Sequence, residues 1–145
     1  MQVEVRELRE EDAGALAEME AEAFSMPWTE RDFRELLEHS YCFYFVALAD
    51  GQIAGCCGYT DICREASIDN VVVAREFRNQ GIGQTLLREV IARGEASGVE
   101  AFTLEVRVSN APAIHLYEKF GFRCEGIRPG FYEKPREDAM IMWRR

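Results

Sequence analysis

The sequence is poor in the residues that build metal and redox sites. It has two histidines, His39 and His115, and five cysteines, no two of which have C-x-x-C spacing. These features argue against a zinc site or a redox-active cysteine pair. Cys56 and Cys57 stand in an apolar stretch, where free cysteine commonly behaves as a small buried hydrophobe. We therefore expect five reduced, structural cysteines and no bound metal.

Long hydrophobic runs are also missing. The longest, Tyr41 to Ala49, has nine residues, far below the roughly 20 that span a bilayer. The first residues lack the charged-then-apolar layout of a signal peptide. With 48% hydrophobic and 30% charged residues, the chain is typical of a single globular domain over residues 1–145. We expect a cytoplasmic protein without a membrane partner.

Lysine is scarce, and negative charge exceeds positive charge. Only Lys119 and Lys134 are lysines, and the net charge of −9 argues against direct, non-specific nucleic-acid binding. Most of the excess lies in residues 1–40, which hold 12 acidic and 4 basic side chains. Two interpretations remain open. These carboxylates cover the solvent faces of two N-terminal helices, or their field attracts a basic partner.

The hydrophobic pattern alternates between strand and helix periods. It predicts seven strands and four helices. The strands are expected at 3–5, 42–49, 53–59, 68–74, 102–108, 122–127 and 139–143. The helices are expected to begin near Glu10, Thr29, Gly83 and Asn110, where Thr29 with Asp32 resembles a capping box and Asn110 suits an N-cap. This order predicts a mixed α/β fold with a largely antiparallel sheet.

The most specific local signal is Arg78-Asn79-Gln80-Gly81-Ile82-Gly83, an R-x-x-G-x-G loop between an apolar strand and an amphipathic helix. Gly81 and Gly83 allow backbone conformations and close approach that a Cβ would block. The unpaired N–H groups and positive dipole end of the helix can then cradle a pyrophosphate. The spacing matches neither the Rossmann nor the P-loop motif. By themselves, two glycines at a helix start also fit a plain strand-to-helix turn.

Further motifs surround this loop in a fixed order. Val71-Val72-Val73 precedes it, Leu104-Glu105-Val106 and Asn110 follow, and Leu116 to Phe122 reads L-Y-E-K-F-G-F. In order and spacing over about 70 residues, these segments resemble the GCN5-related N-acetyltransferase (GNAT) superfamily.

Four segments carry a narrower resemblance: Pro27-Trp28-Thr29, Leu104 to Arg107, Ser109-Asn110 and Arg136 to Met142. They resemble the RimI group, which acetylates the N-terminal alanine of the small-subunit ribosomal protein numbered eighteen. Two features depart from that group. Phe131-Tyr132 stands where it often has two tyrosines, and the following loop, residues 133–136, is short. Both lie where the group receives its peptide, so they bear on substrate choice rather than on acetyl transfer.

The resemblance implies the GNAT fold, a largely antiparallel sheet of about seven strands with about four helices, and acetyl-CoA in a cleft where the fourth and fifth strands splay apart. The backbone of Val71, Val72 and Val73 would pair with the pantetheine arm. Arg78 would add positive charge, and Asn110 would contact CoA, cap its helix, or do both. The pyrophosphate would be held by the N–H groups of Asn79, Gln80, Gly81, Ile82, Gly83 and Gln84.

The resemblance also implies direct transfer without a covalent protein intermediate. Glu105, on the polar side of its strand, would act as general base, directly or through water. Tyr117 would act as general acid for the CoA thiolate. From the residues alone, Glu105 could be a solvated glutamate and Tyr117 a packed core aromatic. Trp28 and Tyr132 would line the peptide slot, although Tyr132 also fits an ordinary hairpin aromatic.

Acid–base chemistry favours an α-amine as acceptor. An α-amine with a pKa near 7.7–8 is roughly a tenth neutral at pH 7, whereas a lysine near 10.4 is neutral less than about one time in a thousand. We therefore expect acetylation of the N-terminal α-amine, by resemblance that of alanine, of a basic protein such as a ribosomal protein. The enzyme is expected to be a monomer or weak homo-oligomer. The alternatives are a small-molecule amine or lysine side chain as acceptor, or a non-catalytic acyl-CoA-binding module.

Overall fold

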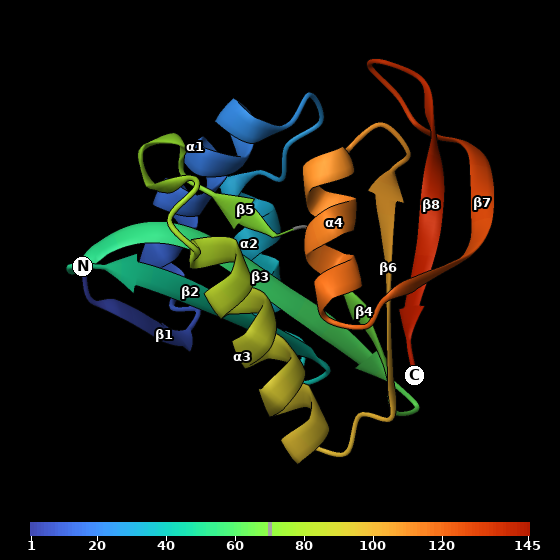
Figure 1. Ribbon diagram of the computed structural model, residues 1–145. Coiled ribbons are helices and arrows are strands. Elements are labelled where there is room, and N and C mark those ends of the chain that lie inside the picture. The colour runs from blue at the N-terminus through green and yellow to red at the C-terminus, as the bar shows by residue number, and fades with distance from the viewer. Residues whose placement is uncertain (70) are drawn as a thin grey trace.

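Figure 1 shows the computed structural model of the protein, which describes residues 1–69 and 71–145. Its strands are β1 (Val3–Glu7), β2 (Cys42–Ala49), β3 (Gln52–Ile62), β4 (Glu65–Ile68), β5 (Val72–Val73), β6 (Ala101–Arg107), β7 (Arg123–Tyr132) and β8 (Glu137–Arg144). Its helices are α1 (Ala13–Ala23), α2 (Glu30–Leu36), α3 (Ile82–Ala96) and α4 (Ala111–Lys119), with the short 3-10 helices η1 (Glu10–Asp12) and η2 (Arg75–Phe77). Within the described residues, no helix is long and apolar enough to cross a membrane.

The strands form one sheet in the order β1-β2-β3-β4-β6-β8-β7, and β5 pairs with β3 outside this path. Only the pairing of β4 with β6 is parallel among the strand pairs of the described residues. The prediction of a mixed, largely antiparallel sheet with four helices is therefore confirmed.

The sheet has eight strands because the prediction of one strand over residues 68–74 is wrong. That segment contributes to two strands, β4 and β5. Tyr59 of β3 pairs with Ile68, and Cys56 of β3 pairs with Val72, so three steps along β3 face four steps along the opposing chain. The two ladders are therefore out of step by one residue, and β4 and β5 are separate strands. Hydrophobic periodicity within one segment does not reveal such a mismatch with its neighbour.

The sheet opens just beyond β4. Ser67 pairs with Thr103 at the end of the β4–β6 ladder. Past this point β5 pairs with β3, whereas β6 continues beside β8 as far as Arg107 with Ala139. In the view of Figure 1, α4 stands between β5 and β6. The expected separation of the fourth strand from its neighbour is confirmed, because the chain past β4 and the second half of β6 have different partners.

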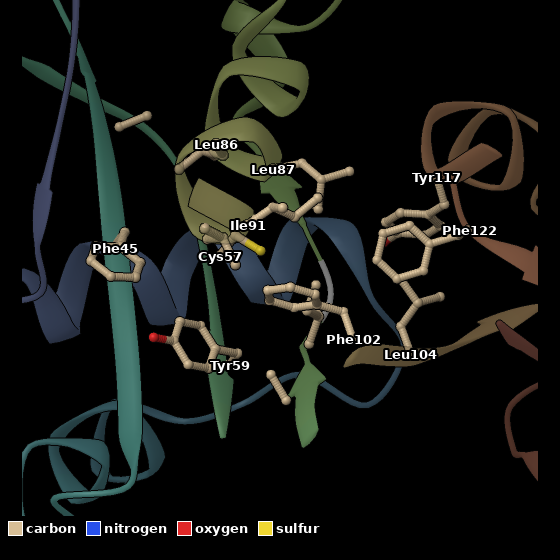
Figure 2. Packing of buried hydrophobic residues seen from close by; sticks show 14 of the residues in the cluster. Phe45, Cys57, Tyr59, Leu86, Leu87, Ile91, Phe102, Leu104, Tyr117 and Phe122 are labelled. Atoms are coloured by element: carbon tan, nitrogen blue, oxygen red, sulfur yellow. The ribbon is translucent and has the colours of Figure 1, made fainter. Parts of the chain in front are cut away.

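Two hydrophobic clusters hold helices on opposite faces of the sheet. Alternate residues of β2 divide between them, with Tyr44 and Val46 in the α1–α2 cluster and Phe45 and Ala47 in the α3–α4 cluster. Side chains alternate faces along a strand, so these two sets point in opposite directions. Figure 2 shows the α3–α4 cluster, which is centred on Leu86, Leu87, Ile91, Phe102 and Leu104.

The last hairpin is longer than its sequence pattern predicts. β7 was expected to end at Ile127, but it pairs with β8 as far as Tyr132 opposite Glu137. Most side chains of β7 are exposed, so its second half has no alternating hydrophobic pattern to mark it. The other predicted elements agree with the structure to within a few residues. The extension matters because it carries Phe131 and Tyr132 to the site described next.

Candidate active site

A pocket lies on the α1–α2 side of the sheet, beside the point where β4 and β6 part. Its walls come from α1, the α1–α2 loop, β2, β4, β6 and β7. It is lined by Glu20, Trp28, Tyr44, Ser67, Ile68, Asp69, Glu105, Phe131 and Tyr132. The lining therefore unites Glu105, Trp28 and Tyr132, three of the residues singled out in the sequence. It combines three carboxyl groups with four aromatic rings.

Glu105 points into this pocket from β6. Its neighbours Leu104 and Val106 are buried in the α3–α4 cluster, so the pleat directs Glu105 to the opposite face. One third of its side chain remains exposed, and its Oε1 lies 3.7 Å from Nη1 of Arg128 on β7. The carboxylate is thus accessible from the pocket and paired with a cation at its rim.

Trp28 and Tyr132 both line the pocket, from the α1–α2 loop and from β7. Trp28 precedes the capping box of α2, in which Thr29 and Asp32 bond reciprocally at 2.8 and 3.2 Å. Its ring packs edge-on against Phe33, with centroids 5.3 Å apart. Burial, reinforced by the charge of Glu105, raises the pKa of Tyr132 to about 12. Both rings are held by packing, and the Tyr132 phenol stays protonated at neutral pH.

Glu20 and Asp69 also face this pocket, and neither was singled out in the sequence. Glu20 on α1 is only 5% exposed, and burial raises its pKa to about 7 against a hydrogen bond from the Trp28 backbone. Asp69 follows β4, and burial together with the charge of Glu20 raises its pKa to about 7. One feature of the sequence could have indicated Glu20. Glu20 stands four residues after Leu16, on the apolar face of α1, where a glutamate is unusual.

The glycine loop has the form expected of an anion cradle. Gly81 is the N-cap of α3 with φ of +82°, and no side chain caps the helix. A Cβ added at Gly81 would meet no atom within 4 Å, so the space beside it is open. At Gly83 a Cβ would make ordinary contacts of 3.5 Å or more, so the protein's own packing does not require glycine there. The free N–H groups of the first turn fit a pyrophosphate.

The other loop residues have separate tasks. The Nε of Arg78 donates to the Val73 carbonyl oxygen at 3.1 Å, which holds the guanidinium at the end of β5. Ile82 is buried in the α3–α4 cluster and anchors the first turn of α3. Asn79 has a left-handed φ of 61°, and the Gln80 side chain donates to the Glu76 carbonyl oxygen. Gln84 is partly buried in the same turn.

β5 offers one edge for an extended ligand. Val72 is buried against α1 and α2, while Val71 and Val73 pack toward α3 and α4. β5 pairs with β3 alone among the strands of the described residues, so its second edge has no strand beside it. A pantetheine arm could therefore add to this edge in the manner of a strand.

Tyr117 and Asn110 come from α4. Tyr117 is 3% exposed, and its ring packs edge-on against Phe122 with the centroids 5.9 Å apart. Figure 2 shows these two rings in the α3–α4 cluster, and Tyr117 does not line the pocket. Burial raises its pKa well above the usual value, against a hydrogen bond from the Val71 backbone to the hydroxyl. That contact puts the hydroxyl at the start of β5, although its ring is a core aromatic. Asn110 caps α4 by accepting the Ala113 N–H at 3.3 Å.

Known proteins share both the sequence and the fold. A Bacillus subtilis (strain 168) protein provisionally named ribosomal protein bS18-alanine N-acetyltransferase is 43% identical over 140 residues, covering 96% of this chain and 93% of that protein. The Escherichia coli (strain K12) ribosomal protein bS18-alanine N-acetyltransferase is 35% identical, covering 95% and 94%. The crystal structure of the Escherichia coli ribosomal-protein-S18-alanine N-acetyltransferase superposes with a TM-score of 0.91 at 33% identity, covering 99% and 93%. Residues 13–122 match the Acetyltransferase (GNAT) family, and the chain belongs to that family.

Proposed function

We propose that this protein transfers the acetyl group of acetyl-CoA to the N-terminal α-amine of a basic protein, with the alanine terminus of ribosomal protein bS18 as its substrate. The observation that carries the proposal is the pocket. It places three carboxyl groups beside the opening of the sheet, and no arginine, lysine or histidine is among its described lining residues. A negative, aromatic-walled pocket favours a cationic amine. The names of the relatives support alanine and bS18 as the acceptor.

Acetyl-CoA would bind beside β5 and the start of α3. The loop before α3 and the first turn of that helix, residues 79–84, would hold its pyrophosphate, with Arg78 adding charge at the end of β5. The β5 edge, Val71 to Val73, would pair with the pantetheine arm. Asn110 already caps α4, and its amide nitrogen is left for a CoA contact. The bound group supplies a thioester, whose carbonyl carbon takes the amine as the C–S bond breaks.

Two residues of the chain would carry out the proton transfers of this reaction. Glu105 would accept a proton from the attacking nitrogen, directly or through a water. Tyr117 would donate to the departing sulfur, which is a thiolate with an ordinary pKa near 8.5. Burial keeps the Tyr117 phenol protonated, as this role requires. An α-amine suits this arrangement better than a lysine because much more of it is neutral near pH 7.

The proposal is tested by acetyl-CoA turnover on two basic peptides, read by mass spectrometry. One has a free N-terminal alanine followed by arginine and contains no lysine, and the other has a blocked N-terminus and an internal lysine. We expect acetylation of the first alone. Acetylation of the blocked peptide alone would overturn the α-amine assignment. A thermal shift with acetyl-CoA, which must appear if the folded protein binds it, checks the co-substrate independently.

A further inference from the structure

Three carboxyl groups share the acceptor pocket, but only one of them has a cation. Glu105 lies 3.7 Å from Arg128. Neither Glu20 nor Asp69 has an ion-pair partner among the arginines, lysines and histidines of the residues that the structure describes. Burial of an unpaired carboxylate is unfavourable and tends to raise its pKa. The presence of two such carboxyl groups in one pocket therefore suggests that they have a role in the reaction.

The ionisable groups around Asp69 come from every side of the pocket. Glu20 approaches from α1, Tyr44 from β2, Cys56 and Cys57 from β3, and Glu105 and Tyr132 line the same cavity. Burial raises the pKa values of Tyr44, Cys56, Cys57 and Tyr132, so these four stay neutral near pH 7. Glu20, Asp69 and Glu105 are thus the acidic groups of the pocket, and Arg128 lies beside Glu105 as the cation at its rim.

The proposed reaction removes two protons from the acceptor nitrogen, whereas Glu105 can accept only one. An α-amine arrives largely as R–NH3+, and its nitrogen must lose two protons to become an amide. One is lost before attack on the thioester and one after it. Sulfur gains one proton, which Tyr117 would supply. Glu105 has one site for a proton, so a second acceptor in the pocket would allow the bound ammonium to lose its first proton there.

We propose that Asp69 takes the first proton from the acceptor ammonium, and that Glu20 is a positioning residue that acts on Asp69 through its charge. The inference rests on the proposed function. The ammonium loses a proton to the Asp69 carboxylate, the neutral amine then forms the C–N bond, Glu105 takes the second proton, and the C–S bond breaks with protonation of sulfur by Tyr117. One proton returns to Tyr117 and one is released to solvent, which balances the reaction.

Two observations support Asp69 in this role. It lines the pocket together with Glu105, so one bound nitrogen can be within reach of both carboxylates. Its pKa of about 7 is also close to that of an α-amine, and a general base is most effective when its pKa lies near the working pH. Glu20 contributes because a like charge nearby raises the pKa of Asp69 further.

The test compares two acceptors that differ in the protons they must lose. One peptide ends in alanine, and the other ends in an aminooxy group, which is already neutral near pH 7 and loses only one proton. We expect Asp69→Asn to lower kcat/KM for the alanine peptide about 100-fold at pH 7. The aminooxy peptide should change less than about threefold, because it bypasses the step assigned to Asp69. Equal losses with both peptides, or no loss with either, would overturn the inference.

A pH profile tests Glu20 and covers the case in which Asp69→Asn fails to fold. Glu20→Gln removes a like charge, so the acidic limb of kcat/KM for the alanine peptide should move to lower pH. Glu18→Gln is the matched control, since Glu18 is an exposed glutamate on the same helix. A limb that stays in place in Glu20→Gln would contradict the role of this residue. If the wild type binds acetyl-CoA but acetylates neither peptide, the proposed function fails, and the inference fails with it.

Discussion

The guanidinium of Arg107 lies 4.5 Å from the ring centre of Tyr132 and ties down the turn beyond it. It donates to the carbonyl oxygens of Glu133 and Pro135 at 3.0 and 2.9 Å, and to the Glu137 carboxylate at 3.1 Å. One side chain from β6 thus holds the β7–β8 turn and a wall of the acceptor pocket together.

Replacement of Arg107 should therefore weaken peptide binding more than acetyl-CoA binding. We expect Arg107→Ala to raise the peptide KM about tenfold and to lower the free energy of unfolding by about 1–3 kcal/mol, since several charge-assisted hydrogen bonds are lost. Steady-state kinetics and urea denaturation measure the two effects. Arg123→Ala, an exposed arginine of the same hairpin, is the control and should change neither. An unchanged peptide KM in Arg107→Ala would contradict this account of the hairpin.

Glu105→Gln separates an enzyme from a non-catalytic acyl-CoA-binding module. The amide keeps the shape of the side chain but accepts no proton, so kcat should fall about 100-fold while the Kd for acetyl-CoA stays the same. Single-turnover kinetics and calorimetry give the two values. Glu118→Gln, which alters an exposed glutamate on α4, should leave both unchanged. Full activity in Glu105→Gln would remove this residue from the mechanism.

Tyr117→Phe distinguishes a proton donor from a core aromatic. The phenyl ring keeps the edge-on packing against Phe122, so Tm should change little. We expect kcat to fall about 10- to 100-fold because the proton for sulfur is lost. Tyr59→Phe removes another buried hydroxyl from the same cluster, away from the pocket, and serves as the control. If both variants remain fully active, Tyr117 is a packing residue only.

Gly81→Ala tests the anion cradle. Alanine is strained at the φ of +82° found there, and we expect a loss of about 1–2 kcal/mol in stability and a weaker Kd for acetyl-CoA. Gly51→Ala supplies a matched control, because Gly51 has φ of +83° in the β2–β3 turn and equally open surroundings. It should show a similar loss of stability with normal acetyl-CoA binding. Equal effects of the two variants on Kd would argue against the cradle.

The raised pKa values of Glu20 and Asp69 predict an unusual dependence of stability on pH. The pKa of Glu20 rises from 4.5 to about 7 on folding, and that of Asp69 from 3.8 to about 7. The folded state therefore binds more protons between about pH 4 and pH 7, so these groups make the protein less stable as pH rises through that window. Glu20→Gln should raise the free energy of unfolding at pH 8 by on the order of 1–3 kcal/mol, with little effect near pH 4. Thermal unfolding across this range checks the sign, with Glu18→Gln as control.

Interactions between residues close together in the chain made many of the helices and strands predictable from the sequence. The capping residues Thr29 and Asn110, and the left-handed Gly81 before α3, act within a few residues of themselves, so their roles follow from neighbouring residues alone. The strand alternation likewise predicted that Glu105 points away from the α3–α4 core, because side chains alternate along any strand. Most of the element order followed from such local patterns, whereas the family was predicted from the resemblance of its motifs.

Tertiary structure decided what depends on partners far apart in the chain. The division of residues 68–74 between β4 and β5 follows from their register with β3, and the length of β7 depends on pairing with β8. Glu20 and Asp69 line one pocket only because α1 packs against β3 and β5, the strands next to the chain that carries Asp69. Their burial, and with it their raised pKa values, comes from that packing. A sequence specifies each carboxylate, but its solvation is set by the residues that fold around it.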